Sequence, residues 1–141
     1  MGEVKCEVRL ENFVDRCNFE EGKLPEENIR RYITTALVDT GATLLLLPQD
    51  IVEELGLKRL RKAIVTYADE RKEERDVAGV VTLAIGNRAA NLDCVVGPPL
   101  CEPLIGQIAL EEMDLVVDCK DQRLKPRPES PILPLLKCKH T

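Results

Sequence analysis

One acidic residue stands between two apolar segments and is the strongest candidate for chemistry in the chain. Asp39 follows Ala36-Leu37-Val38 and precedes Thr40-Gly41-Ala42-Thr43, after which come four consecutive leucines. A buried carboxylate is costly unless it is paired or hydrogen-bonded. The ordinary interpretation of Asp-Thr-Gly is a surface turn, in which Gly41 supplies a permissive backbone. The apolar flanks disfavour a surface turn, so Asp39 is a candidate for acid–base chemistry.

A second motif lies downstream, where Pro103 precedes Leu104-Ile105-Gly106 and a short predicted helix. The segment Ala36–Thr43 and this Leu-Ile-Gly motif, in this order, resemble the retropepsin-like aspartic proteases. The chain is most similar to the small single-domain prokaryotic members, and the resemblance covers about residues 29–118. Two ordered motifs are more specific than one tripeptide.

The resemblance implies a catalytic role for Asp39 in a homodimer. The chain has a single Asp-Thr-Gly, whereas pepsin-like enzymes carry two, so the chain resembles the retroviral arrangement in which two identical chains each give one Asp. A twofold axis brings equivalent residues face to face, and two adjacent carboxylates share a proton because both cannot easily be ionised. One would activate a water molecule, and the other would polarise the scissile carbonyl and protonate the leaving nitrogen. No cofactor and no metal ion is required.

The resemblance also implies supporting roles around Asp39. Thr40 would hydrogen-bond across the dimer axis, and the backbone of Gly41 would hold the carboxylate. Ala42 and Thr43 complete the active-site loop, and Thr43 replaces an acid that contacts the substrate backbone in many retroviral enzymes, which leaves the substrate preference open. Three residues would pack behind the loop: Leu104, Ile105 and Gly106.

The family places a β-hairpin flap over the substrate, between the two motifs. Residues 66–78 hold that place here, with Tyr67, Ala68 and Asp69 as candidate flap residues. Retroviral flaps have a glycine-rich tip, whereas this segment has no glycine before Gly79. Mixed charge usually faces water, so a solvated hairpin and a substrate-covering lid both remain open, and Tyr67 is predicted to belong to a strand.

The elements that must position these motifs are mostly β-strands. Alternation over residues 4–10 indicates a half-buried strand, which residues 11–19 are expected to continue or return, before an exposed loop over 20–28. Other strands are predicted over 29–38, 44–47, 63–67, 77–85, 89–96, 115–118 and 122–124, with a Gly86-Asn87 hairpin turn. Short helices are predicted from Pro48 to Leu55 and over 108–113. The expected fold class is mainly β: a single-domain retropepsin-like acid-protease β-barrel with one or two short helices, homodimeric.

The chain is predicted to divide into a protease domain over residues 1–125 and a Pro-rich, extended tail over 126–141. The tail carries Ile132, Leu133, Leu135 and Leu136, which a solvated tail would not need. Retropepsins build much of their dimer interface from terminal strands, so residues 4–10 or 132–136 are expected to cross to the partner.

Composition limits the remaining function classes. The 141 residues carry a net charge of -5 and no long basic run, which argues against a nucleic-acid partner. No apolar run reaches the roughly 20 residues that cross a bilayer, and no signal-peptide core is present, so we expect a cytoplasmic protein without membrane contact. Aromatic residues are only 3%, so the core must consist of Val, Ile, Leu and Ala. Reduced thiols are the favoured interpretation of the six cysteines: Cys6, Cys17, Cys94, Cys101, Cys119 and Cys138.

The sequence therefore leaves three possible functions open. The first is an aspartic endopeptidase that acts on an extended polypeptide. The second is a catalytically silent dimeric module of the same fold, which binds an extended peptide by strand addition. The third and weakest is a thiol or metal protein, to which Cys138 and the nearby His140 could contribute.

Overall fold

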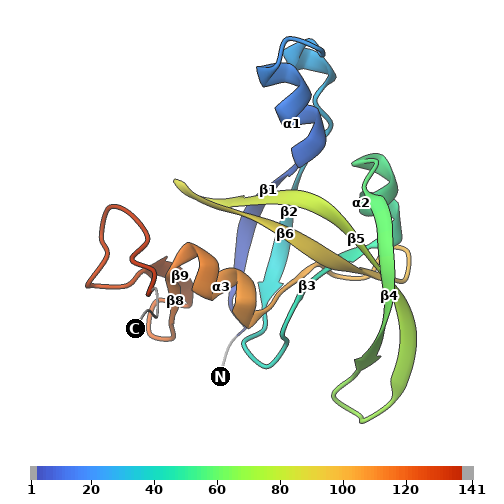
Figure 1. Cartoon of the computed structure of the whole chain (residues 1–141). Coiled ribbons are helices and arrows are strands. Elements are labelled where there is room, and N and C mark those ends of the chain that lie inside the picture. The colour runs from blue at the N-terminus through green and yellow to red at the C-terminus, as the bar shows by residue number, and fades with distance from the viewer. Residues whose placement is uncertain (1–2, 138–141) are drawn as a thin grey trace, which may run out of the picture.

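The structure is a computed structural model that describes residues 3–137, and it is mainly β, as the sequence predicts (Figure 1). Most predicted strands and both predicted helices are present, with shifted ends. The elements are β1 (Lys5–Asn12), α1 (Phe13–Glu20), the 3-10 helix η1 (Glu26–Asn28), β2 (Arg31–Val38), β3 (Leu45–Pro48), α2 (Gln49–Glu54), β4 (Lys58–Thr66), β5 (Lys72–Ile85), β6 (Arg88–Gly97), β7 (Leu104–Ile105), α3 (Gln107–Met113), β8 (Leu115–Asp118) and β9 (Arg123–Pro126).

Seven strands form one sheet in the order β1-β2-β7-β3-β6-β5-β4. β1 also pairs with β5, so the pairings return to their start and leave only β4 outside the ring. The pairings of β2 with β7 and of β3 with β6 are parallel, and the others are antiparallel. β8 and β9 form a separate two-stranded sheet.

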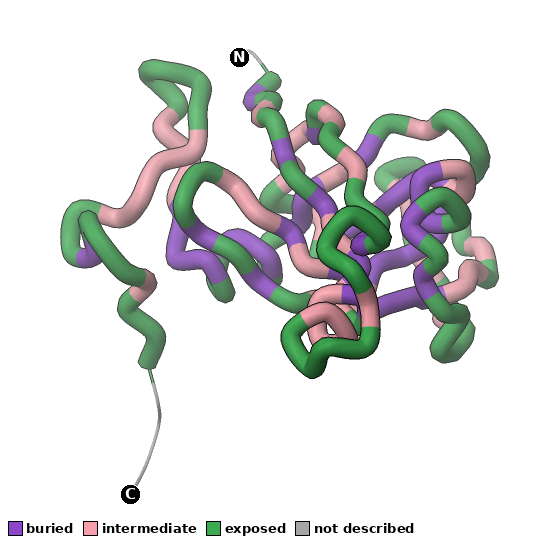
Figure 2. Tube along the Cα trace, turned by 90° about the horizontal axis from the view of Figure 1, so that it is seen from above, coloured by how far each residue is buried: buried purple, intermediate pink, exposed green. Residues whose placement is uncertain are grey.

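Aliphatic side chains fill the space inside this sheet, as the scarcity of aromatic residues predicts. Val8 and Leu10 from β1 meet Leu47 from β3 and Leu83 from β5, and none of them is more than 1% exposed. The alternation along each strand sends the intervening polar side chains outward. Figure 2 shows the buried residues gathered in the body of the molecule, with the C-terminal segment largely exposed at its edge.

The prediction for residues 11–19 is wrong, because the chain leaves β1 at Asn12 and forms α1. The side chain of Asn12 accepts a hydrogen bond from the backbone N–H of Asp15 (3.0 Å) and donates to the carbonyl of Leu55 (2.8 Å). An Asn at this position caps a helix. Asp15 in turn is buried against Arg30, 2.9 Å away. Residues 3–137 thus contain three α-helices instead of one or two, and α1 projects from the top of the body in Figure 1.

After β9 the C-terminal segment forms no helix up to residue 137, but the expected extended course is interrupted by a turn at residues 128–129 and a bend at residues 131–133. Its four large apolar side chains are between 55% and 75% exposed: Ile132, Leu133, Leu135 and Leu136. Within the described part of the chain, no helix is both long and apolar enough to cross a bilayer.

Candidate active site

Asp39 is the first residue after β2, and the backbone around it fixes its carboxylate. Its own N–H donates to the carbonyl of Ile105 (2.9 Å), and its carbonyl accepts from the N–H of Ala42 (3.1 Å). The N–H of Gly41 donates to Oδ1 of the carboxylate at 3.0 Å. The other oxygen, Oδ2, accepts no hydrogen bond from residues 3–137, and Asp39 is half-buried. One carboxylate oxygen is thus held while the other remains available.

A close approach favours glycine at position 41 of this loop. A Cβ atom at Gly41 would lie 3.3 Å from Oδ1 of Asp39, which is tight for a carbon–oxygen contact. A larger residue would push against the oxygen that the same residue's N–H must hold. The expected backbone role of Gly41 agrees with this geometry.

The Leu-Ile-Gly motif lies directly behind the Asp39 loop. Leu104 and Ile105 form β7, which inserts between β2 and β3 and pairs with Leu37, Val38 and Leu46. Ile105 is fully buried. A Cβ atom at Gly106 would come within 2.7 Å of the carbonyl oxygens of Thr43 and Leu44, so no side chain fits there. Two motifs that are more than sixty residues apart thus form one unit.

The N-terminus of α3 completes this unit. The N–H of Gln107 donates to the carbonyl of Ala42 (2.8 Å), and the N–H of Ile108 donates to that of Thr43 (3.1 Å). The first N–H groups of a helix have no partner inside the helix, so here they bind the end of the Asp39 loop. Thr40 is exposed, and its hydroxyl has no hydrogen-bond partner in the described chain.

The predicted flap is a hairpin of β4 and β5, and its tip is closed without glycine. The N–H of Tyr67 donates to the carbonyl of Arg71 (2.8 Å), and the N–H of Glu70 donates to that of Tyr67 (2.9 Å). Glu70 has a φ of 65°, a left-handed conformation that glycine adopts most easily. Ala68 and Asp69 form the turn, and Asp69 accepts from the N–H of Arg71. The prediction that Tyr67 belongs to a strand is wrong, because β4 ends at Thr66.

Tyr67 is the centre of a cluster that braces this tip. The guanidinium of Arg71 lies 4.7 Å from the centre of its ring. Its hydroxyl lies 3.4 Å from Glu73 and accepts from Arg75 at 3.3 Å. The tip and the Asp39 loop lie at the same end of the molecule (Figure 1), but within residues 3–137 no hydrogen bond or ion pair joins them.

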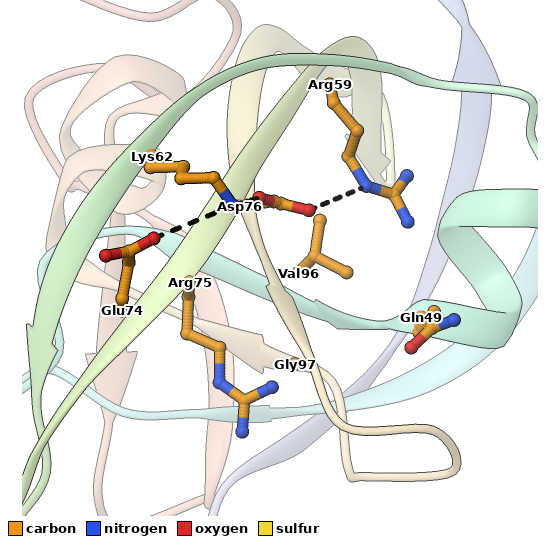
Figure 3. Close-up of a pocket in the computed structure, with 8 residues that line it drawn as sticks. All are labelled: Gln49, Arg59, Lys62, Glu74, Arg75, Asp76, Val96 and Gly97. Atoms are coloured by element: carbon orange, nitrogen blue, oxygen red, sulfur yellow. Dashed lines mark hydrogen bonds and ion pairs between the residues drawn. The ribbon is translucent and has the colours of Figure 1, made fainter.

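Two cavities of about 260 Å³ each lie near these elements. The first, shown in Figure 3, lies at the base of the hairpin, where Asp76 pairs with Lys62 (3.0 Å) and Arg59 (3.3 Å). Lys62 and Arg59 lower the pKa of Asp76, so this polar cavity already has its charges paired. The second lies where the Asp39 loop enters β3, and Leu44 and Ile108 are among its lining residues. Asp39 lines neither cavity.

Comparison with known families shows which protein family the chain belongs to. A family model described as gag-polyprotein putative aspartyl protease matches residues 28–112. That segment contains the Asp39 loop, the β4–β5 hairpin and the Leu-Ile-Gly motif, and it is more than half of the chain. The chain belongs to this retropepsin-like family. No curated protein matches the chain. The family match leaves out β1, α1, the β8–β9 sheet and the tail of this retropepsin-like chain.

The five described cysteines of this retropepsin-like chain are free thiols. Burial raises the pKa of Cys6 to about 11 and that of Cys94 to about 12. Both thiols therefore stay protonated and unreactive near neutral pH. Among residues 3–137, no three His, Cys, Asp or Glu side chains gather where they could hold a metal ion. Cys138 and His140 lie outside the described residues.

The sequence interpretation did not single out Arg88, which is 3% exposed at the start of β6. A signal was present, because alternation along β6 places Arg88 on the same inward side as Ala90. It also passed over Asp114 and Arg127 as functional candidates, and Asp114 is only 7% exposed. These residues lie together at the C-terminal end of α3.

Proposed function

We propose that the chain is an aspartic endopeptidase, in which a second copy of the chain supplies the second catalytic carboxylate. The observation that carries this proposal is the Asp39 loop. Its backbone holds one oxygen of a single half-buried carboxylate and leaves the other available, in a chain of the aspartyl protease family. One such carboxylate cannot be both acid and base at once.

Two Asp39 residues that meet on a twofold axis would share one proton, because like charges at short range cannot both be ionised easily. The ionised carboxylate would take a proton from a water molecule as the oxygen of that water attacks the scissile carbonyl. The protonated carboxylate would hydrogen-bond to the carbonyl oxygen and then deliver its proton to the leaving nitrogen. The free hydroxyl of Thr40 is suited to bridge the two loops across the axis.

The parts outside the family match support a partner subunit. Both edges of the β8–β9 sheet are open in the described chain, and an isolated two-stranded sheet is only marginally stable. Residues 9–11 of β1 already pair with β5 as well as with β2, so residues 132–136 are the better candidate to cross to the partner. The proposal includes two further points. The ring of strand pairings corresponds to the acid-protease barrel, and the protein acts in the cytoplasm.

The tip of the hairpin favours one alternative, a catalytically silent dimeric module that binds extended peptides. Glu70 holds the left-handed position at the tip, and Tyr67 fixes the tip through Arg71 and Arg75. Such a tip is stiffer and more charged than a glycine-rich flap. It would still allow strand addition of an extended peptide, even if it did not close over a reacting bond.

Cleavage of a diverse peptide mixture tests this proposal. The wild type and Asp39→Asn are incubated with the mixture between mildly acid and neutral pH, and products are read by mass spectrometry, with Glu20→Gln on α1 as a matched control. Products formed by the wild type and the control but not by Asp39→Asn would establish an aspartic endopeptidase. Equal products from all three would remove Asp39 from the mechanism. A dimer that binds peptides without cleaving them would establish the silent module.

A further inference from the structure

A buried polar cluster fastens the C-terminal tail to the end of α3. The guanidinium of Arg88 donates to the carbonyls of Met113 (3.1 Å) and Asp114 (2.8 Å) and to that of Ser130. The last carbonyls of a helix have no partner within it and carry partial negative charge. A buried cation therefore suits this position, and Arg88 joins the helix end to the tail.

Asp114 forms the second half of the attachment. It has a φ of 56°, the left-handed conformation that ends many helices, and its carboxylate points into the tail. Arg127 donates to both carboxylate oxygens, and the N–H of Leu135 donates to Oδ2 at 2.8 Å. Arg127 also donates to the carbonyl of Leu135 (3.3 Å). Residues 127–135 therefore form a loop closed on one carboxylate, and we call Arg88, Asp114 and Arg127 the tail anchor.

The opposite end of the same helix holds the Asp39 loop. The N–H groups of Gln107 and Ile108 bind the carbonyls of Ala42 and Thr43. α3 has seven residues, which corresponds to a length of about 10 Å. So short a helix moves as one piece, and its position is set by the contacts at its two ends together with its buried face.

The tail anchor is not explained by burial of the tail itself. Ordering each residue has an entropic cost, and the large apolar side chains of the tail remain more than half exposed. Within residues 3–137, the hydrogen bonds that join residues 127–137 to the rest of the chain are those with Arg88 and with Asp114, which caps α3. The free energy of these contacts therefore helps to hold α3 in its position.

We propose that Asp114 and Arg127 are positioning residues for the Asp39 loop, which act through α3. This inference rests on the proposed function only for its effect on catalysis. Strong hydrogen bonds from Arg127 and from the N–H of Leu135 hold the pKa of Asp114 well below its usual range. The anchor therefore stays formed from neutral to mildly acid pH, where the peptidase test is run.

Amide hydrogen exchange provides a test that does not need activity. Asp114→Gly keeps the left-handed backbone but removes the carboxylate, and Arg127→Ala removes its partner. Couplings of this kind are about 0.5–2 kcal/mol, which is roughly a twofold to thirtyfold change. Each variant is expected to speed exchange of the Gln107 and Ile108 amides by a factor in that range, while the Tyr67 amide is unchanged. The double variant should lose less than the sum of the two singles, because both remove the Asp114–Arg127 interaction.

The matched controls are Glu129→Gln, which removes the exposed partner of Arg127, and Asp114→Asn. The first should behave as wild type. The second keeps an acceptor for Leu135 and tolerates the left-handed backbone, so it should give a smaller effect than Asp114→Gly. If cleavage is established, kcat should fall in parallel with the exchange effect while KM changes less than about twofold.

Unchanged exchange at Gln107 and Ile108, with fast exchange at Leu135, would show a released tail without any effect on the helix and would overturn the inference. Arg127→Ala keeps the test valid if Asp114→Gly fails to fold, because Arg127 lies on the tail and outside the core. A wild type that cleaves no peptide would refute the proposed function, while the exchange result would still decide whether the anchor positions the loop.

Discussion

Replacing Gly106 by alanine should damage the active-site loop although Asp39 is untouched. Gly106 has a φ of -90°, which any residue adopts, so the change brings no backbone strain. The added Cβ would lie 2.7 Å from the backbone of Thr43 and Leu44. Backbone cannot swing away as a flexible side chain can, so the loop and α3 must separate.

The size of the effect follows from what this separation breaks. Overpacking in a well-packed site destabilises by about 1–3 kcal/mol. The hydrogen bonds from Gln107 and Ile108 to the loop span the same gap, and each contributes about 1 kcal/mol. With both hydrogen bonds lost, we therefore expect the free energy of unfolding to fall by about 3–5 kcal/mol. In the proposed peptidase, a displacement of about 1 Å at the Asp39 carboxylate would lower kcat/KM roughly a hundredfold.

Urea unfolding and peptide cleavage measure the two effects, and Gly86→Ala is the control. Gly86 has a φ of 59° and nothing within 4 Å of its would-be Cβ. Alanine there meets backbone strain without crowding, so we expect a loss of about 1 kcal/mol and normal cleavage. A Gly106→Ala protein as stable and active as Gly86→Ala would refute the steric argument for the loop.

Three further predictions concern other parts of the chain. Arg88→Met should lower the free energy of unfolding by about 3 kcal/mol or more, measured in urea, because three buried carbonyls lose their donor; a loss below about 1 kcal/mol would contradict this assignment. Arg30 lowers the pKa of Asp15 from 3.8, so the pair stabilises the fold above that pH and loses its effect as the pH falls further. The urea unfolding midpoint of Asp15→Asn should therefore depend less on pH below about 4 than that of wild type. Midpoints of the two proteins that change in parallel with pH would show that the Asp15–Arg30 pair does not contribute to stability. Iodoacetamide near pH 8 should modify the exposed Cys119 and spare Cys6 and Cys94, whose pKa values are about 11 and about 12; mass spectrometry before and after unfolding checks this, and early labelling of Cys94 would contradict its burial.

The sequence was sufficient to predict the Asp39 loop and most of the strands around it. Alternation and β-branched residues reflect the burial of one face, and this local pattern persists in the fold. The resemblance to the retropepsin-like family further implied that Leu104 and Ile105 would lie behind Asp39, and β7 runs there.

The elements that were mispredicted depend on contacts between distant residues. α1 begins after Asn12, whose side chain caps the helix and also binds Leu55, and its first turn is fixed by Arg30. No local pattern reports either contact. The tip of the hairpin depends on Tyr67 meeting Arg71 across a turn closed by Glu70, although glycine is the residue that usually indicates such a turn.

The tail anchor was missed for the same reason. Arg88, Asp114 and Arg127 come from a hairpin strand, a helix end and an extended segment. The sequence around each of these residues, taken alone, is ordinary. Their common function becomes visible only when the C-terminal end of α3 is seen in three dimensions.

The insertion of β7 between β2 and β3 also determines when the active-site loop can form. Its pairings join Leu37 and Leu46 to Leu104, so the loop depends on contacts of high contact order, which form slowly. Chains fold as they emerge from the ribosome with the N-terminus first, and a nascent chain that ends before residue 104 lacks the strand on which Asp39 rests. The Asp39 loop is therefore completed only after most of the chain has been synthesised, so an unfinished polypeptide does not expose the assembled loop.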